Sequence, residues 1–370
     1  MKVIDKVYKG EHPLYPLERL CDVSHALFID IETTGLKKET TSLYLIGCGY
    51  YTEEGFKVRL FFGERCSEEE MLLREFVSFS RGFDHLIHFN GTGFDIPYLS
   101  YKAERYDISG MFDGMQQLDV YRLCKPLRYL LFSQTMRQKA IEDFLGIDRK
   151  DMYDGGQLIE VYKQFEQTGS DELFDMLITH NLEDVLGMHR MLPVLYYLDL
   201  KDADISYIGY EIRPYLDLEG NRCEEVIFSY NTRVSFPKSF VSKTDTMYLK
   251  ASADTGNILI RLPLYRTQMK LFFDNYKDYC YLPDEDTVIP RELASSLLPG
   301  RYRKATKETC CKKADGRFMK QPDAVFSPVF KTSLKDKKKY FRFPEDFDEK
   351  AADIFGRELI NVFFKMKKRN

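Results

Sequence analysis

Hydrophobic and polar positions in the first third of the chain predict strands and helices in alternation. The apolar run HALFIDIETTGL (25–36) predicts a buried strand, and the runs SLYLIGCGYY and FKVRLFF, joined by a polar turn, predict a hairpin after it. SEEEMLLREFVSF has Ser67 and, three residues later, Glu70, which is typical of a capped helix. HLIHFN predicts another strand and FDIPYLSYKAERY another helix. This order predicts an α/β fold with a mixed sheet covered by helices.

The pattern changes twice further along the chain. Residues 118–197 are mainly helical in pattern, whereas short β-branched or aromatic runs separated by turn residues follow residues 201–206. The final segment, DEKAADIFGRELINVFFKMKKRN, predicts one amphipathic helix with a basic tail. We therefore expect an N-terminal extension (1–23), an α/β domain (24–200) and a second, mostly β domain (206–370) that ends in a helix.

Length and charge agree with two domains and add one asymmetry. A chain of 370 residues with 44% hydrophobic and 30% charged residues can form a full core under an ordinary charged surface. Residues 301–370 carry 20 Lys and Arg against 10 Asp and Glu, which leaves 34 against 48 in residues 1–300. The basic C-terminal region is either a surface for an anionic partner or a solvated lysine-rich surface.

The cysteines and the apolar runs exclude several classes of protein. None of the eight cysteines forms a C-x-x-C pair, and Cys310 and Cys311 are adjacent, so free thiols are favoured over disulfides or a zinc site. No stretch approaches 18 consecutive apolar residues, and the first twenty residues lack an apolar signal-peptide core. We expect a cytoplasmic protein with no membrane partner.

Two acids interrupt the first apolar strand. Asp30 and Glu32 share one face because residues i and i+2 of a strand point the same way, while the apolar residues at 27, 29 and 31 share the other. Like charges so close disfavour each other's ionisation. Mg²⁺ or Mn²⁺ would resolve the conflict, because both ions prefer hard oxygen ligands.

Asp95 is one candidate for a further ligand. It follows the strand HLIHFN, and the end of a sheet strand is a common position for a site residue. An Asp at a helix start, followed by Pro97, is also ordinary helix N-terminal chemistry. Both interpretations remain open at this point.

Asp184 is another candidate. It lies on one helical stripe, formed by positions 173, 177, 180, 184, 188 and 191, that is apolar except at His180 and Asp184, one turn apart. A lone Asp in such a stripe is often a satisfied edge residue, whereas an Asp one turn after a His is a candidate site residue. Glu183 is rotated from Asp184 by about 100°, and we expect it to face solvent.

Taken in order, FIDIETTGL, HFNGTGFDIPYL and HNLEDVLGM resemble the three motifs of the DEDD superfamily of 3′–5′ exonucleases, which share the ribonuclease H-like fold. The stretch between the last two, from LDVYRLCKPLRYLL to AIEDFLGIDRKDMYDGGQLIEVYKQF, is similar to the bacterial YprB-like branch. The resemblance covers about residues 24–195. The four metal-binding acids that it implies are Asp30, Glu32, Asp95 and Asp184, which would bind two divalent ions, Mg²⁺ or Mn²⁺. It places Thr33 and Leu36 against the terminal nucleotide, and it gives Asn90 a supporting role in the second motif.

The third motif departs from the superfamily pattern. One branch has a Tyr four residues before the final Asp, and the other has a His five residues before it. This chain has His180 four residues before Asp184. We expect His180 to orient or deprotonate the attacking water, because an unperturbed pKa near 6.5 suits a general base. A structural His180, with water activation left to the metal, is the alternative.

These features predict a metal-dependent 3′–5′ exonuclease that hydrolyses single-stranded 3′ ends of DNA or RNA by a two-metal mechanism and releases nucleoside monophosphates. One alternative is a noncatalytic nucleic-acid-binding module on a degenerate nuclease fold. Another is a nuclease subunit whose second domain (206–370) docks a protein partner. In that domain, ETCCKKADGRFMKQ and KTSLKDKKKYFRF mix basic and aromatic residues, as nucleic-acid grooves do.

Overall fold

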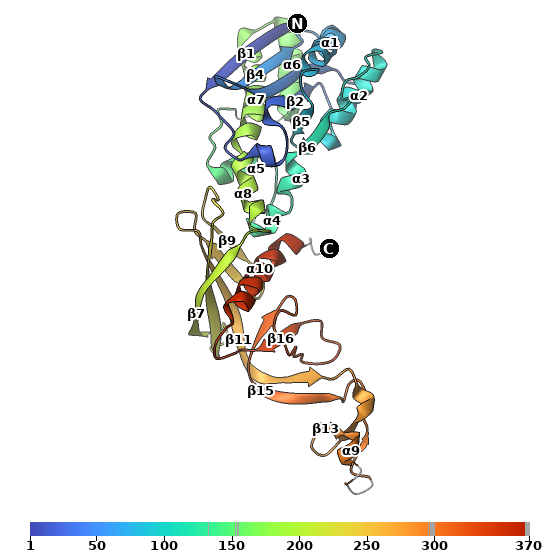
Figure 1. Ribbon diagram of the computed structural model, residues 1–370. Helices are drawn as coiled ribbons and strands as arrows, with labels where there is room; N and C mark the ends of the chain where they lie inside the picture. The colour runs from blue at the N-terminus through green and yellow to red at the C-terminus, as the bar shows by residue number, and fades with distance from the viewer. Residues whose placement is uncertain (132, 152, 154, 295, 297–299, 367–370) are drawn as a thin grey trace. The chain divides into compact units, whose positions relative to one another are not determined.

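The computed structural model describes residues 1–131, 133–151, 153, 155–294, 296 and 300–366. The chain forms two compact units (Figure 1). Unit 1 comprises Met1–Arg128 and Ser133–Leu198, and unit 2 comprises residues 129–132 and Asp199–Asn370. The chain leaves unit 1 after Leu198, close to the predicted end of the α/β domain at residue 200.

A six-stranded mixed sheet organises unit 1, with strand order β1-β4-β3-β2-β5-β6. The strands are β1 (Lys2–Lys9), β2 (Ala26–Thr33), β3 (Leu43–Thr52), β4 (Gly55–Phe62), β5 (His85–His88) and β6 (Gln116–Asp119). Within β1-β4-β3-β2 every pair is antiparallel, whereas β5 and β6 continue the sheet parallel to β2. The predicted α/β fold with a mixed sheet is confirmed.

The N-terminal segment differs from the expectation. We predicted an extension over residues 1–23, but Lys2–Lys9 form β1 and pair along their whole length with β4. Most side chains of β1 are exposed, so its pairing depends on backbone hydrogen bonds rather than on buried apolar residues. This segment is therefore part of unit 1.

The helices of unit 1 are α1 (Glu69–Ser80), α2 (Asp95–Arg105), α3 (Val120–Cys124), α4 (Leu127–Leu130), α5 (Gln138–Leu145), α6 (Gly155–Thr168), α7 (Asp171–Arg190) and α8 (Tyr196–Asp199), of which α4 and α8 lie at the unit boundary. The long helix α7 begins at Asp171 because the Ser170 side chain accepts a hydrogen bond from the Leu173 amide. Asp171 and Glu172 in its first turn, and Arg190 in its last, also match the helix dipole.

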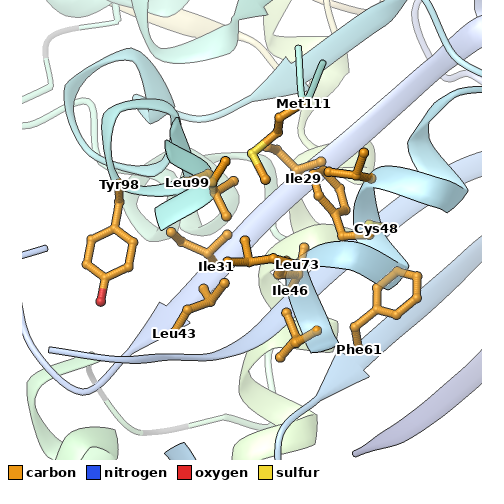
Figure 2. Close-up of a cluster of buried hydrophobic side chains, with 14 of the residues drawn as sticks. Ile29, Ile31, Leu43, Ile46, Cys48, Phe61, Leu73, Tyr98, Leu99 and Met111 are labelled. Atoms are coloured by element: carbon orange, nitrogen blue, oxygen red, sulfur yellow. The ribbon is translucent and has the colours of Figure 1, made fainter. Parts of the chain in front are cut away.

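The two faces of β2 have different neighbours. Figure 2 shows the first face, where Ile29 and Ile31 lie in an apolar cluster with Ile46, Cys48, Leu73 and Leu99 from β3, α1 and α2. Burying each large aliphatic side chain of this kind contributes about 1.5–3 kcal/mol. The other face of β2 lies against α7, which contacts β2, β3 and β4. The alternation along β2 thus separates an apolar layer from the face that carries Asp30 and Glu32.

Two glycines of β3 let α7 approach the sheet. Gly47 pairs with Asp30, and a Cβ on Gly47 would clash with Asn181 and lie 2.8 Å from the Val185 side chain. A Cβ on Gly49 would lie 2.7 Å from the other methyl group of Val185. The missing side chains therefore determine how closely α7 packs onto the sheet beside Asp30.

Unit 2 is mostly β, as predicted. Its seven-stranded sheet contains β7 (Ile205–Leu216), β8 (Arg222–Thr232), β9 (Phe240–Lys243), β10 (Tyr248–Ala251), β11 (Asn257–Phe272), β15 (Cys311–Gln321) and β16 (Lys339–Arg342). A three-stranded sheet contains β12 (Tyr279–Leu282), β13 (Thr287–Pro290) and β14 (Arg303–Lys304), with α9 (Arg291–Ala294) after β13. All strand pairs in both sheets are antiparallel.

The C-terminal helix α10 (Glu349–Lys365) is also as predicted. Asp348 caps it by accepting a hydrogen bond from the Ala351 amide, and its apolar face is buried. The predicted basic tail at 367–370 lies outside the described residues. The eight cysteines are free thiols. Within the described part of the chain, no helix combines the length and the apolar character needed to cross a bilayer.

Candidate active site

The site begins where β2 loses its partner on one side. Residues Ala26–Phe28 of β2 pair with β5, but the strand continues beyond β5 while keeping its pairing with β3. Asp30 pairs with Gly47 of β3, and Glu32 pairs with Leu45. The two carboxylates therefore lie at the C-terminal end of β2, on the face covered by α7.

Asp95 reaches the same strand from the opposite edge. It is the first residue of α2, and its side chain does not cap the helix, because Phe94 occupies the N-cap position. Its carboxylate instead accepts hydrogen bonds from its own amide and from the Ile31 amide, which lies between Asp30 and Glu32. The Asp95 carboxylate therefore lies beside β2 and does not cap α2.

α7 brings the remaining residues of the site. His180 Nε2 lies 3.4 Å from Glu32 Oε1 and 3.1 Å from Asp184 Oδ2. Asn181, on the next position of the helix, donates a hydrogen bond of 2.7 Å to Asp30 Oδ2. Three separate segments, β2, the start of α2 and the middle of α7, therefore meet in one cluster.

Three acids of the cluster, Asp30, Glu32 and Asp95, have a raised pKa. Burial is the largest cause for Asp30, followed by the charges of Asp184, Glu32 and Asp95. Burial and then Asp184 and Asp95 likewise hold the pKa of Glu32 well above its usual range. For Asp95, burial raises the pKa to about 6, although its two backbone hydrogen bonds lower it. Without added positive charge, the cluster disfavours its own ionised form.

A divalent ion fits this donor set. Glu32, His180 and Asp184 each offer a ligand atom, and these three atoms all lie within 4.8 Å of one another. Ligands about 2.1 Å from one ion are separated by about 3.0–3.4 Å when their angle at the ion is 90–109°. The separations of 3.1 and 3.4 Å at His180 Nε2 match that range. Asp30 and Asp95 are the carboxylates available beside this group.

Two charged residues outside the motifs also reach the site. Arg149 donates from a terminal nitrogen to Asp184 Oδ1 at 2.6 Å, and Asp151 lies 2.7 Å from His180 Nδ1. The sequence interpretation gave neither residue a role. The only signal that could have indicated Arg149 and Asp151 was the charged run DRKD, which directly follows RQKAIEDFLGI (137–147) in the stretch with a mainly helical pattern.

Glu183 differs from the expectation that it faces solvent. Its carboxylate accepts hydrogen bonds from the amides of Lys150, at 3.0 and 3.1 Å, and Asp151, at 2.8 Å. The expected rotation away from Asp184 is correct, but the segment after α5 covers this part of α7. Glu183 therefore fixes the backbone that carries Arg149 and Asp151.

The predicted substrate-contacting residues occupy two turns. Thr33 is buried, and its hydroxyl donates to the Gly35 carbonyl, which closes the turn after β2. Leu36, in the same turn, is 81% exposed, so it is free to contact a ligand.

Asn90 lies in the turn between β5 and α2. It has a left-handed backbone (φ 63°), and its amide donates to Asp119 Oδ1. Thr92 donates to the other oxygen of Asp119, at 3.0 Å. Asp119, which the sequence interpretation did not single out, thus holds the turn that precedes Asp95.

A family model matches the part of the chain that contains this site. Residues 27–196 match the family model described as the RNase_H superfamily. A comparison with curated proteins gave no match. Similar solved structures include the family B DNA polymerase of the archaeon Pyrobaculum calidifontis (18% identity, 47% of this chain and 25% of that chain, TM-score 0.37).

Two further similar structures are nucleases. One is described as the apo form of a nuclease (16% identity, 52% of this chain and 80% of that chain, TM-score 0.31). The other is Escherichia coli exonuclease I with single-stranded DNA and zinc (11% identity, 78% of this chain and 64% of that chain, TM-score 0.29). This chain spans a quarter of the length of the polymerase. The matched family model and the sheet order together show that residues 27–196 form a ribonuclease H-like domain.

Proposed function

We propose that this protein is a metal-dependent 3′–5′ exonuclease of the DEDD type, from the YprB-like branch. The observation that carries the proposal is the meeting of four acids, distant along the chain, in one partly buried cluster: Asp30, Glu32, Asp95 and Asp184. Burial and the charges of neighbouring acids raise the pKa of Asp30, Glu32 and Asp95, and divalent cations relieve this electrostatic conflict. A purely structural role gives no reason to hold these carboxylates together.

The same four acids would hold the ions, Mg²⁺ or Mn²⁺. Two ions bound there would supply an activated water and would neutralise the charge on the attacking and leaving oxygens of a phosphodiester. The side chains of β2, α2 and α7 fix where that charge is stabilised, because they come from regular elements packed on a common core. The products are nucleoside monophosphates.

His180 is the one imidazole in the cluster. Its Nδ1 is bound to Asp151, and its Nε2 faces Glu32 and Asp184. With the Nδ1 proton held by Asp151, Nε2 keeps a lone pair for one partner at a time: the ion, as the donor set above allows, or a proton of the attacking water. We assign His180 the second role, orienting or deprotonating this water, when substrate and both ions are bound.

The substrate is a single-stranded 3′ end of DNA or RNA. Thr33 is the last residue of the strand that carries Asp30 and Glu32, and Leu36 lies in the turn that follows, which suits contact with the terminal nucleotide. Asn90 supports the turn before Asp95. The basic residues at 301–366 in unit 2 offer an additional surface for the phosphate backbone.

Hydrolysis of labelled strands tests this function. Single-stranded DNA and RNA with a 5′ label are incubated with the full chain in Mg²⁺ or Mn²⁺. We expect a ladder that shortens from the 3′ end and that disappears with EDTA and with Asp30→Asn. A 3′-labelled strand should release its label as a mononucleotide. Either no cleavage in both metals, or a ladder unchanged in Asp30→Asn, would overturn the proposal. Oligonucleotide binding that persists in EDTA without cleavage would indicate a noncatalytic binding module.

A further inference from the structure

The segment 149–151, between α5 and α6 and outside the three motifs, is fixed against α7. Glu183 accepts both the Lys150 and the Asp151 amide, so two consecutive peptide units are bound to one carboxylate. Hydrogen bonds with a charged acceptor are stronger than neutral ones. The backbone of this segment is therefore held in one register relative to the turn of α7 that carries His180 and Asp184.

The guanidinium of Arg149 is held from two sides. One terminal nitrogen lies 3.0 Å from an oxygen of Glu142, whose side chain is fully buried in α5, and the other lies 2.6 Å from Asp184 Oδ1. Gln138 of α5 connects the same two residues, since its side-chain amide donates to the Glu142 carboxylate and to the backbone carbonyl of Asp184. Gly187 of α7 leaves room for the Glu142 side chain, because a Cβ on Gly187 would lie 2.9 Å from the Glu142 carboxyl carbon. The planar fork of Arg149 is thus pinned between α5 and α7.

The contacts divide the atoms of Asp184 and His180 into two sets. Asp184 Oδ1 is bound by Arg149, while its Oδ2 points to His180 Nε2 inside the cluster. His180 Nδ1 is bound by Asp151, while its Nε2 faces the cluster. In both side chains the outward atom is held by segment 149–151, and the inward atom is available to a ligand.

Charge strengthens this arrangement. Asp151 Oδ1 accepts a hydrogen bond of 3.0 Å from the Tyr153 amide, and its Oδ2 lies 2.7 Å from His180 Nδ1. The side chain of Asp151 is almost fully buried, and Lys139 and Arg149 lie within 4 Å of it. An ionised Asp151 can only accept from His180, which fixes a proton on Nδ1.

We propose that Arg149 and Asp151 are positioning residues of the metal site: Arg149 turns Asp184 so that Oδ2 faces the ion, and Asp151 fixes the tautomer and ring orientation of His180. The proposal rests on the metal site of the proposed function. Outer partners of metal ligands commonly change metal affinity by 10–100-fold when they are removed. Segment 149–151 thus becomes a fourth part of the site, beside the three motifs.

A competing role for Arg149 makes the opposite prediction. If Arg149 were only a counter-ion that an incoming metal must displace from Asp184, Arg149→Gln would tighten metal binding, and Arg149→Lys would leave it nearly unchanged. If Arg149 orients Asp184, both variants weaken binding, because neither side chain can hold Glu142 and Asp184 with a planar fork. The sign of the change therefore separates the two roles.

Calorimetric titration of the metal-free full chain with Mn²⁺ is the test. We expect Arg149→Gln, Arg149→Lys and Asp151→Asn each to raise the Kd for Mn²⁺ by about 10–100-fold. Arg74→Gln and Arg74→Lys are matched controls, because Arg74 pairs with Glu70 on the exposed side of α1, away from the cluster; both should leave the Kd unchanged. The unfolding temperature in EDTA shows which variants fold, and Asp151→Asn alone suffices if the Arg149 variants do not. Saturating Mn²⁺ should restore most of the turnover of Arg149→Lys.

Three outcomes would overturn this inference: tighter Mn²⁺ binding in Arg149→Gln, an unchanged Kd in both Arg149→Lys and Asp151→Asn, or no Mn²⁺ binding by the wild-type chain. A wild-type protein that binds Mn²⁺, loses affinity in these variants and yet cleaves no strand would overturn the exonuclease proposal alone. A wild-type protein that cleaves strands while the variants keep its metal affinity would overturn only the positioning roles.

Discussion

Asn181 Nδ2 donates a 2.7 Å hydrogen bond to Asp30 Oδ2 and so links the middle of α7 to β2. The two residues are 151 positions apart in the chain, and Asn181 is fully buried. The hydrogen bond that orients Asp30 also fixes the distance between α7 and the sheet. It does so close to Asp184, because Asn181 precedes Asp184 by three positions. The metal-binding face of β2 and that of α7 are therefore aligned by one side chain between them.

The glycine opposite Asp30 should be essential for this alignment. In Gly47→Ala the new methyl group would clash with Asn181 and approach Val185, both fully buried, so α7 must move away from β3. Overpacking of this kind costs about 1–3 kcal/mol. We expect a lower unfolding temperature for unit 1 and weaker Mn²⁺ binding. Gly82→Ala is the control, because nothing lies within 4 Å of a Cβ at that position. Equal unfolding temperatures and Mn²⁺ affinities of the two variants would contradict the close packing of α7 against β3.

A buried ion pair should hold α2, and hence Asp95, in place. Lys102 of α2 lies 2.9 Å from Glu69 of α1, both side chains are buried, and Glu69 also accepts hydrogen bonds from the Leu43 amide and the Tyr106 hydroxyl. Lys102→Met leaves a buried carboxylate without its cation, which costs about 3–5 kcal/mol. Chemical denaturation should show this loss.

The double variant gives the decisive comparison. Adding Glu69→Gln to Lys102→Met removes the unpaired charge, so we expect it to recover a large part of the lost free energy of unfolding. A double variant as unstable as Lys102→Met would mean that lost packing, rather than an unpaired charge, causes the destabilisation.

The packing of segment 149–151 against α7 can be tested at Glu183. Because it binds the Lys150 and Asp151 amides, Glu183→Ala should expose both to exchange, at a cost of about 1 kcal/mol for these partly exposed hydrogen bonds. Hydrogen exchange measured by mass spectrometry on peptides that contain these amides would detect the change. Glu160→Ala, on the exposed face of α6, should leave the exchange as it is. Unchanged protection in Glu183→Ala would show that the segment is held by other contacts.

The sequence was sufficient for the parts of the site that depend on local periodicity. The two-residue repeat of β2 placed Asp30 and Glu32 on one face, and the helical stripe placed His180 and Asp184 one turn apart, because both relations follow from backbone geometry alone. The α/β fold followed from the order of apolar runs in the same way.

The remaining contacts depend on the path of the chain between elements. Arg149 reaches Asp184 over 35 positions and Asp151 reaches His180 over 29, through an irregular segment whose course no periodicity encodes. The N-terminal strand was missed because an edge strand paired through its backbone needs few apolar side chains. The contacts of Glu183 were missed for a related reason: helical periodicity gives the direction of its side chain, but it does not show which other segment packs against that side of the helix.

The stability of the metal-free protein should depend on pH through Asp95. In the unfolded chain this carboxyl has its ordinary pKa of 3.8, whereas burial raises the pKa to about 6 in the folded protein. Between these values the folded state keeps a proton that the unfolded state has lost. The stabilisation is therefore complete below about pH 4 and is lost as the pH rises through 6. At 1.36 kcal/mol per pH unit, the loss amounts to at most about 3 kcal/mol.

Asp95→Asn isolates this contribution because it removes the titrating group while keeping the shape of the side chain. In EDTA we expect the variant to be more stable than the wild type at pH 7.5 and close to it at pH 4.5. Asp5→Asn should instead be less stable than the wild type at both pH 7.5 and pH 4.5, since hydrogen bonding to Arg59 lowers the pKa of Asp5 to about 2 and its contribution is lost only as the pH falls from about 4 to 2. Saturating Mn²⁺ at pH 7.5 should stabilise the wild type more than Asp95→Asn, because the ion takes the place of the lost proton. Equal pH profiles for Asp95→Asn and wild type in EDTA would show that Asp95 is ionised without a metal, contrary to the electrostatics of the cluster.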